Sequence, residues 1–442
     1  MTNKAVKINL LDFKSPQMRA FHMSWFAFCL CFISWFGIAP LMTVVREELQ
    51  LTKAQIGNTI IASVAVTIFA RLLIGRLCDK FGPRLCYTAL LIFGSIPVMC
   101  IGLADSYSSF LLFRLAIGVI GASFVITQYH TTLMFAPNVV GTANATTAGW
   151  GNLGGGLTQI IMPLLFTGII AFGFTEASSW RIAMVIAGCV CFIVGIAYFF
   201  LTQDTPEGNF KDIKRDEGVK EKKSSIFNIS KDYRVWILFL VYGGCFGIEL
   251  TMNNIAAMYF FDNFKLDLKT AGLIAGLFGL MNLFARSLGG IIGDKFGIRW
   301  GLKGRVRWLM IALLVEACAL TLFSRMDQLA FAIGALIIFS LFVQMSEGAT
   351  YSVVPFINKK GIGLVSGIVG AGGNLGAVSA GFLFKGAFEW SDALLILGGV
   401  VFFIALTVPF IKFSAAEENE TRVEIDTALK TREELEAKLA IG

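Results

Sequence analysis

Residues 67–84 read TIFARLLIGRLCDKFGPR, and residues 282–299 read NLFARSLGGIIGDKFGIR. The two segments are identical at 10 of 18 positions, and 215 residues separate each aligned pair. A second matching pair, GNLG at Gly151–Gly154 and GNLG at Gly373–Gly376, is offset by 222 residues. Two motifs that recur in the same order indicate an internal duplication, so the fold is expected to contain two related halves.

The composition excludes most soluble classes. The chain has 442 residues, of which 56% are hydrophobic and only 15% are charged, whereas a soluble domain averages about 25% charged residues. The nine cysteines and two histidines form no CxxC motif or Cys/His cluster, so we expect no metal site and no cofactor. No nucleotide-binding or Ser/His/Asp motif is present either. These features favour a membrane protein over a soluble enzyme or a disordered chain.

Twelve apolar runs are long enough to cross a bilayer, which takes about 20 residues of helix. Short connections such as 104–109 predict antiparallel neighbours, and a β-barrel would instead show alternating ten-residue segments. We therefore predict an all-α membrane protein with twelve transmembrane helices in two pseudosymmetric six-helix halves. The predicted spans cover residues 20–45, 55–77, 86–104, 109–132, 144–171, 180–202, 234–261, 270–292, 307–324, 328–355, 362–386 and 390–413.

A long polar segment divides the spans into six plus six. Lysine and arginine concentrate in the connections on the side of both termini, which the positive-inside rule places in the cytoplasm. This asymmetry explains the net charge of +7 without a nucleic-acid partner. We therefore expect a monomer in the lipid bilayer of the cell membrane. The predicted regions are a tail at 1–19, a half at 20–202, a linker at 203–233, a second half at 234–413 and a solvated helical tail at 414–442.

The repeated loop motif places glycines and an aspartate at fixed spacing. It reads GRLCDKFGPR at 75–84 and GIIGDKFGIR at 290–299. The glycines allow helices to approach closely, and Asp79 and Asp294 can pair with basic groups at the cytoplasmic face and so favour one state of a gate. The alternative explanation of the motif is helix capping together with the positive-inside topology. The motif resembles the loop signature of the major facilitator superfamily, which implies the fold of that superfamily.

Several ionisable side chains fall where a bilayer makes them costly, at least about 2.5–3.5 kcal/mol each at its centre. Arg71 and Arg286 occupy equivalent positions in the two repeats. Guanidinium groups on opposite sides of a central cavity repel each other when the cavity is empty, and one monovalent anion between them relieves that repulsion. Pairing of each arginine with an acid or a helix-end carbonyl is the alternative. The other ionisable residues within apolar runs are Arg114, Glu249, Glu316 and Glu347.

The GNLG segments bring amide groups to the same membrane depth in both halves. Small residues such as Gly151 and Gly373 let transmembrane helices pack closely, but packing does not explain an asparagine at the same place in each copy. Asn152 and Asn374 carry amides whose burial without a partner is costly. An oxyanion could accept hydrogen bonds from these amides, so the GNLG segments are predicted to contribute to an anion site.

At these residues the chain resembles the nitrate/nitrite porter family of the major facilitator superfamily. The glycine- and asparagine-containing segments 149–156 and 370–376 resemble the two nitrate signatures of that family. The stretch YGGCFGIELTMNN at 242–254 and VVPFI at 353–357 are similar to the plant and fungal high-affinity nitrate transporters. The resemblance implies nitrate, and often nitrite, as substrate. It also implies alternating access by rocking of two halves.

The resemblance also implies roles for individual residues. Arg71, Arg286 and Asn152 match anion ligands, and Phe124 matches an aromatic residue that flanks the anion in bacterial members, although helix packing alone would explain a phenylalanine. Tyr242 matches another flanking aromatic less securely. A second tyrosine of some bacterial members falls on Leu238 in this sequence, which puts that contact in doubt.

Coupling to protons would require a titratable acid near the path. Glu249 and Glu347 are the candidates, since their spans line the cavity in this superfamily, and pairing with an arginine to hold a gate is the alternative. Arg114 resembles another superfamily motif and is expected to be structural or to take part in coupling. Similarity to the plant and fungal proteins favours symport of nitrate with protons.

Other functions remain open at the level of the sequence. A nitrate/nitrite exchanger on the same fold needs no proton, because its site never has to cross the membrane empty. A porter of another small anion is compatible with the two arginines but not with the doubled GNLG. A membrane-bound enzyme would need a catalytic constellation, and a nitrate sensor would bind the anion without moving it.

Overall fold

The computed structural model describes residues 3–212, 226–266, 268–385 and 388–441. Within these ranges the chain is almost entirely helical and forms no strand, apart from isolated bridges such as that between Ala5 and Phe135. The predicted all-α class is therefore confirmed. Residues 213–225, which make up much of the predicted linker at 203–233, lie outside the described residues.

The first predicted half contains eight α-helices and short 3-10 turns. Three of these turns extend helices into full spans: one follows α1, one follows α4, and one joins α5 to α6 into a single span from Tyr107 to Met134. The helices are α1 (Pro16–Phe36), α2 (Met42–Glu48), α3 (Lys53–Phe81), α4 (Pro83–Cys100), α5 (Tyr107–Gly118), α6 (Ser123–Met134), α7 (Val140–Ala171) and α8 (Glu176–Leu201).

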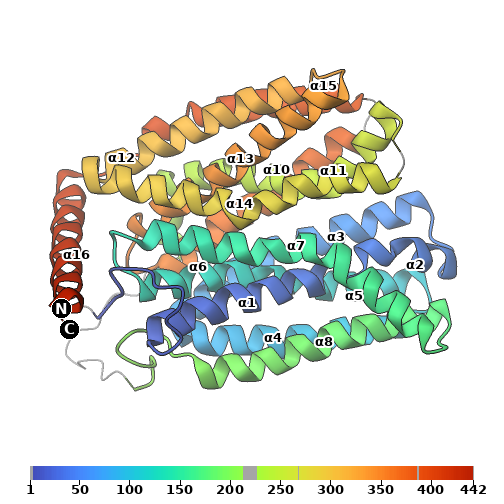
Figure 1. Ribbon diagram of the computed structural model, residues 1–442, viewed down its shortest axis with the longest axis horizontal. Coiled ribbons are helices and arrows are strands. Elements are labelled where there is room, and N and C mark those ends of the chain that lie inside the picture. The colour runs from blue at the N-terminus through green and yellow to red at the C-terminus, as the bar shows by residue number, and fades with distance from the viewer. Residues whose placement is uncertain (1–2, 213–225, 267, 386–387, 442) are drawn as a thin grey trace.

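The second predicted half lies beside the first in Figure 1, with its helices roughly parallel to those of α1–α8. Only α16 departs from this direction, because it lies across one end of the bundle. Its helices are α10 (Tyr233–Phe264), α11 (Leu268–Leu280), α12 (Ala285–Phe323), α13 (Leu329–Val353), α14 (Ile362–Lys385) and α15 (Trp390–Ala405). Helix α9 (Ile226–Ser230) lies in the predicted linker, and α16 (Ala415–Ile441) lies in the predicted C-terminal tail.

Eleven described segments are long and apolar enough to cross a membrane, and one of them, Leu273–Phe323, holds two predicted spans. The chain reverses inside it at Gly301, where φ is 68° and ψ is −157°. Trp308 Nε1 donates a hydrogen bond to the carbonyl of Gly289 at 2.8 Å, whereas 19 residues of straight helix would extend about 28 Å. The two predicted spans are therefore separate: the eighth runs through α11 into the first arm of α12, and the ninth lies in the second arm of α12. The expected loop between them, residues 293–306, is instead helical apart from the break at Gly301.

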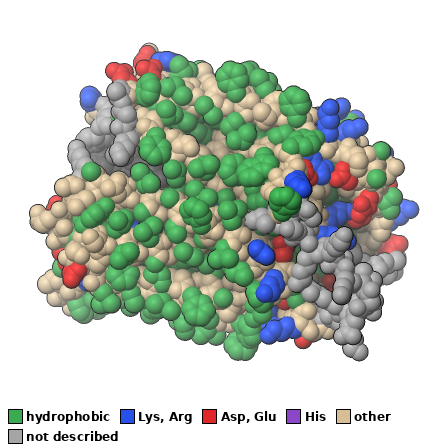
Figure 2. Space-filling model, turned by 180° about the vertical axis from the view of Figure 1, so that it is seen from behind, with side chains coloured by type: hydrophobic (Ala, Val, Ile, Leu, Met, Phe, Trp, Pro, Cys, Tyr) green, Lys and Arg blue, Asp and Glu red, His purple; other side chains and the backbone are tan. Residues whose placement is uncertain are grey.

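Apolar and charged side chains segregate along the bundle. Hydrophobic side chains cover the middle of the face in Figure 2, while lysine, arginine, aspartate and glutamate gather toward the ends. Large apolar residues such as Phe93 and Phe403 are about 70% exposed, which suits contact with lipid tails rather than water. Both chain termini lie at the end crossed by α16 (Figure 1), which we call the terminal end.

Helices α3 and α14 meet closely only toward the terminal end. A side chain at Gly75 would collide with the carbonyl of Gly363, and a side chain at Gly363 would come within 2.6 Å of the carbonyl of Gly75. Gly57 and Gly381 each lie 18 residues from these glycines, five turns away on the same helix faces. A side chain at either would meet nothing within 4 Å. The two helices therefore contact at the terminal end and separate toward the other end.

The C-terminal segment predicted as a solvated helix does form a helix, but α16 is docked against the bundle. Glu418 accepts hydrogen bonds from the backbone N–H groups of Leu302 and Lys303, both at 3.0 Å. Glu417 pairs with Arg234 at 3.0 Å, and hydrogen bonds from Ser414 hold the pKa of this carboxyl below its usual value although partial burial acts in the opposite direction. Helix α16 is therefore exposed on its outer face and makes specific contacts with the bundle through its inner face.

Candidate functional site

Arg71 on α3 is fully buried where the two predicted halves meet. Its Nε donates to the carbonyl of Gly121 at 3.1 Å, and its Nη1 donates to the carbonyl of Gly370 on α14. Its Nη2 has no hydrogen-bond partner among the described residues. An unpartnered N–H of a buried cation is costly, so this atom is suited to an acceptor that the protein itself does not provide.

Arg286 near the start of α12 is also fully buried, but its neighbours are different. Its Nη1 forms an ion pair with Glu347 Oε2 and lies 3.9 Å from Glu249 Oε2. Its Nη2 donates to the hydroxyl of Tyr242 at 2.8 Å. The predicted alternative in which an arginine pairs with an acid therefore describes Arg286. Arg71 donates instead to backbone carbonyls, of which that of Gly370 lies inside α14 rather than at a helix end.

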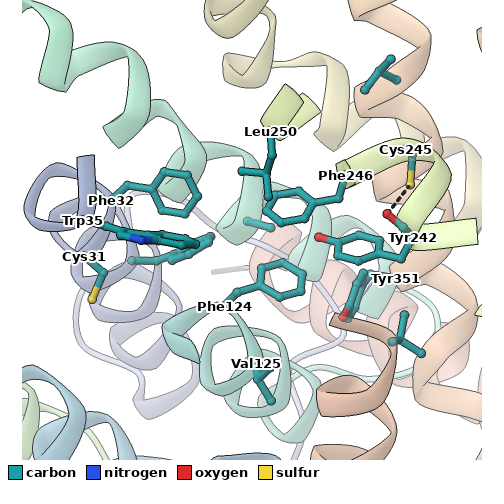
Figure 3. Packing of buried hydrophobic residues seen from close by; sticks show 14 of the residues in the cluster. Cys31, Phe32, Trp35, Phe124, Val125, Tyr242, Cys245, Phe246, Leu250 and Tyr351 are labelled. Atoms are coloured by element: carbon teal, nitrogen blue, oxygen red, sulfur yellow. Dashed lines mark hydrogen bonds between the residues drawn. The ribbon is translucent and has the colours of Figure 1, made fainter. Parts of the chain in front are cut away.

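Phe124 on α6 lies between the two arginines. Its ring centroid is 5.0 Å from the guanidinium carbon of Arg71 and 5.5 Å from that of Arg286. Figure 3 shows its ring facing Tyr242 and Phe246 on α10 and Tyr351 on α13. The ring stacks with Tyr242 at 5.4 Å between centroids and meets Tyr351 edge-on at 5.0 Å. Aromatic faces attract cations, so these rings fix the directions of both guanidinium groups.

The two asparagines of the GNLG copies have different partners. Asn152 Nδ2 donates to Glu249 Oε2 at 3.0 Å, and the same carboxylate accepts from Asn282 at 2.6 Å. Asn374 Nδ2 donates instead to the backbone carbonyl of Val64 at 3.2 Å. Asn152 thus belongs to the cluster around Arg286, whereas Asn374 bridges the two halves through the backbone. Substrate contact by either amide stays a prediction.

Gly151 and Gly373 each make room for an aromatic ring. A side chain at Gly151 would collide with the ring of Phe28, and one at Gly373 would come within 2.5 Å of the ring of Phe246 and 3.0 Å of that of Tyr242. The second glycine therefore positions the aromatic residues beside Arg71. The contacts in the structure are packing contacts, and direct contact of these glycines with substrate stays a prediction.

The loop aspartates bridge the two halves at the terminal end. Asp79 accepts backbone hydrogen bonds from Gly363 at 3.1 Å and Leu364 at 3.0 Å, in the first turn of α14. Asp294 accepts from the backbone of Gly141 at 3.1 Å and Thr142 at 2.6 Å, in the first turn of α7. Each carboxylate thus lies at the positive end of a helix in the opposite half. This arrangement is compatible with the predicted gating role, which stays a prediction.

Asp294 also pairs with Arg305 at 2.6 Å and accepts a hydrogen bond from the hydroxyl of Thr142 at 2.7 Å. Arg114 lies apart from this gate and from the central cluster. It is buried on α5 and donates to the carbonyl of Trp35 at 3.0 Å and to the hydroxyl of Ser63 at 3.2 Å. These contacts tie α5 to α1 and α3, so the structural part of the expectation for Arg114 has a direct geometric basis.

The structure adds three residues that the sequence analysis did not select. Phe246 stacks on Tyr242 at 5.0 Å and its ring lies 5.1 Å from the guanidinium carbon of Arg71. Tyr351 packs against Phe124, and Asn282 bonds to Glu249. Each lies four residues from a selected residue, namely Tyr242, Glu347 or Arg286. Because residues four apart on one helix share a face, this spacing was the available signal for Phe246 and Tyr351. Asn282 lies in a 3-10 turn before α12, so its spacing from Arg286 gave no such signal. Leu238, where a second tyrosine was in doubt, is fully buried.

Comparison with known families identifies the architecture. Residues 24–357 match the Major Facilitator Superfamily. The chain belongs to this superfamily. It is 43% identical over 411 residues to the high affinity nitrate transporter 2.5 of Arabidopsis thaliana, a match that covers 92% of this chain and 82% of that protein. It is 30% identical over 438 residues to the nitrate/nitrite transporter NrtP of Nostoc punctiforme, with 82% of this chain and 86% of that protein covered. The predicted family resemblance is confirmed.

Solved structures support the same fold. The human organic anion transporter MFSD10 superposes with a TM-score of 0.65 at 13% identity, over 89% of this chain and all of that one. A bacterial homolog of the human lysosomal transporter Spinster gives a TM-score of 0.60 at 18% identity, over 94% of this chain and 98% of that one. The chain is therefore a multi-pass membrane transporter of the Major Facilitator Superfamily, with the predicted pseudosymmetric architecture.

Proposed function

We propose that this chain transports nitrate and nitrite across the cell membrane by alternating access, without an enzymatic step, and that protons move with the anion. The terminal end, which carries both termini, faces the cytoplasm in this proposal. The names of the relatives support nitrate and nitrite as substrates. The concentration of lysine and arginine in connections at that end supports the orientation.

The observation that carries the proposal is the environment of Arg71. Its guanidinium is fully buried between the halves, with its carbon 5.0 Å from the Phe124 ring and 5.1 Å from the Phe246 ring. Its unpartnered Nη2 can donate to an anion oxygen. A flat, weakly hydrated, singly charged oxyanion suits a planar donor beside aromatic rings. A tetrahedral dianion would need more donors than this wall offers.

Charge balance supports a role for protons. The cluster contains two cations, Arg71 and Arg286, and two neighbouring carboxyls, Glu249 and Glu347. With both carboxylates ionised these four groups sum to zero, so a bound anion leaves one uncompensated negative charge. Because an unbalanced charge is costly in a low-dielectric interior, entry of the anion favours protonation of one glutamate. Each anion would thus be accompanied by about one proton.

Glu347 is the better placed of the two glutamates for this exchange. Its Oε2 occupies Nη1 of Arg286, the donor that an incoming anion would need. Its Oε1 has no hydrogen-bond partner among the described residues. Protonation would weaken the ion pair and release the guanidinium of Arg286 to the anion. In this proposal Glu249 stays bound to Asn152 and Asn282 and maintains the position of Arg286.

The contacts at the terminal end define one state of the proposed cycle. Asp79 and Asp294 join the halves there, whereas Gly57 and Gly381 face open space at the other end of the same contact. This asymmetry corresponds to a transporter closed toward the cytoplasm. Release of the anion into the cytoplasm would require both aspartates to leave the helix ends that they cap.

The test is initial nitrate uptake into proteoliposomes of the purified chain. Empty vesicles with an inward proton gradient are compared with nitrite-loaded vesicles without a gradient. Symport predicts uptake into the empty vesicles, and Glu347→Gln should abolish this gradient-driven uptake while it preserves uptake into the loaded ones. Glu433→Gln on the exposed α16 is the control. Uptake by the wild type only into nitrite-loaded vesicles would show exchange instead.

Exchange of nitrate for nitrite is the second candidate, and the ion pair of Glu347 with Arg286 favours it if that pair only holds a gate. Transport of a different anion and sensing without flux are separated by the same vesicles. Excess sulfate should leave nitrate uptake unchanged, because selection rests on a planar, singly charged anion. Binding of nitrate without uptake in either preparation would indicate a sensor.

A further inference from the structure

Glu316 is a buried carboxyl that the proposed cycle does not use. It lies on the second arm of α12 and is fully buried. Neither of its carboxyl oxygens has a hydrogen bond of normal geometry among the described residues. The hydroxyl of Ser346 on α13 lies beside it and interacts with it weakly, and this hydroxyl also lacks a well-formed hydrogen bond within the described chain.

Glu316 and Ser346 adjoin the central cluster through Glu347. Ser346 precedes Glu347 in the sequence. The carboxyl of Glu347 lies within range of electrostatic interaction with both Arg286 and Glu316. Arg286 and Glu316 also lie within range of electrostatic interaction with the thiol of Cys245 on α10. The carboxyl of Glu347 therefore has a cation on one side and two unsatisfied polar groups nearby.

When Glu347 leaves Arg286, its carboxyl loses a hydrogen-bond donor, and Glu316 and Ser346 can supply new ones. A carboxyl that leaves its cation in a buried cluster needs new hydrogen-bond donors, since an unsatisfied buried acceptor is costly. Glu316 in its neutral form carries one O–H donor and Ser346 carries another. The neutral form is the one that a carboxyl without a cation adopts most easily in such surroundings.

We propose that Glu316 is a positioning residue that receives the side chain of Glu347 when an anion takes its place on Arg286. This inference rests on the proposed function, because it requires anion binding at Arg286. In the anion-bound state the O–H groups of Glu316 and Ser346 donate to the carboxyl of Glu347. The side chain of Glu347 thus alternates between Arg286 and Glu316, and the second position lowers the cost of anion entry.

The test is nitrate affinity of the purified chain, measured by calorimetry with sodium nitrate and compared with uptake. Glu316→Met keeps a similar volume but removes the donor, and we expect a Kd increased by about fivefold to tenfold, as for the loss of one hydrogen bond between neutral groups. Glu316→Gln retains an N–H donor and should bind nitrate within about threefold of the wild type. Ser346→Ala should give a smaller increase than Glu316→Met, because one donor remains.

A double-mutant cycle with Glu347→Gln separates this role from general packing. If Glu316 acts through Glu347, Glu316→Met should change the Kd little in the Glu347→Gln background. Equal weakening in both backgrounds, or a Glu316→Gln variant as weak as Glu316→Met, would overturn the inference. Should Glu316→Met fail to fold, Ser346→Ala with and without Glu347→Gln supplies the same cycle. Failure of the wild type to bind nitrate would instead refute the proposed function.

Discussion

Arg71 and Arg286 occupy the same place in two copies of one repeat, yet the two halves give them different partners. Arg71 in the first half donates to the carbonyls of Gly121 and Gly370 and lies against aromatic rings. Arg286 in the second half pairs with Glu347 and with the hydroxyl of Tyr242. Duplication therefore preserved the cation in each half, while the residues around it diverged.

The difference follows from the distribution of acids. Glu249, Glu316 and Glu347, the fully or almost fully buried glutamates, all lie in the second half of the described chain. The carbonyls around Arg71 cannot gain or lose a proton, so its charge is fixed. The carboxyl beside Arg286 can be protonated, so the net charge of that side is variable. In the proposed function, the two related halves would thus offer an anion one contact of fixed charge and one of variable charge.

The largest expected effect comes from exchanging each arginine for lysine. Lysine has a single ammonium group and cannot supply the fork of donors. Arg71→Lys and Arg286→Lys should each reduce initial nitrate uptake by about 100-fold, as for the loss of two charge-assisted hydrogen bonds at roughly 1.5 kcal/mol each. The comparison predicts a further difference: Arg71→Lys should weaken nitrate binding at every pH, whereas Arg286→Lys should also change how uptake depends on the proton gradient.

Proteoliposome uptake at several external pH values, together with calorimetric nitrate binding, measures both effects. Arg299→Lys, at the end of the loop motif, is a matched control because it lies outside the central cluster. Near-normal uptake in both central variants would remove the argument for a shared anion site. Identical pH profiles in the two variants would show that the halves do not differ in the proposed way.

The second comparison concerns the aspartates of the two loop motifs. Asp294 pairs with Arg305 in addition to its backbone donors, whereas Asp79 accepts from the backbone of Gly363 and Leu364. Asp294→Asn leaves the fully buried Arg305 without its carboxylate, a change that typically costs about 3–5 kcal/mol. Asp79→Asn should cost about 1–2 kcal/mol, since an amide oxygen still accepts one hydrogen bond.

Thermal unfolding of the purified variants in detergent measures the order of their stabilities. Nitrate exchange in proteoliposomes measures the effect of each substitution on the proposed gate. Asp294→Asn should lower the unfolding temperature more than Asp79→Asn and should slow exchange more strongly. The double variant with Arg305→Met provides the control, because it removes the unpaired cation and should recover part of the lost stability. An Asp79→Asn variant that is the less stable of the two would contradict the comparison.

The features that the sequence predicted are those that repetition and periodicity determine. The duplicated motif indicated two halves and placed Arg71 and Arg286 at matching depths, since an 18-residue match leaves little freedom of register. The turn at Gly301 was harder to predict from the sequence. Its flanking residues 293–306 are polar enough to be interpreted as a loop, yet they continue both arms of α12 because Asp294 and Arg305 satisfy each other inside the fold.

The partners of each arginine were beyond the reach of sequence reasoning. Carbonyls such as those of Gly121 and Gly370 carry no side-chain signal. The surroundings of Arg71 therefore depend on how α14 and the turn between α5 and α6 pack against α3. Glu347 was predicted as a candidate acid. Whether its carboxyl is free or paired depends on its distance from the guanidinium of Arg286, which lies on a different helix. Spacing within one helix is readable from the sequence, whereas contact between helices is not.

The smallest expected effect concerns Asn152 and Asn374, and it tests whether the acid cluster matters beyond Arg286. Asn152→Ala removes a donor from Glu249, which then keeps Asn282 and a distant Arg286. This loss should raise the KM for nitrate by about fivefold, the effect of one net hydrogen bond near 1 kcal/mol. Asn374→Ala removes only a bond to the carbonyl of Val64 and should raise KM by about twofold or less. A larger effect at Asn374 would mean that its amide binds the anion directly, so that the second half contributes a donor to recognition in addition to Arg286.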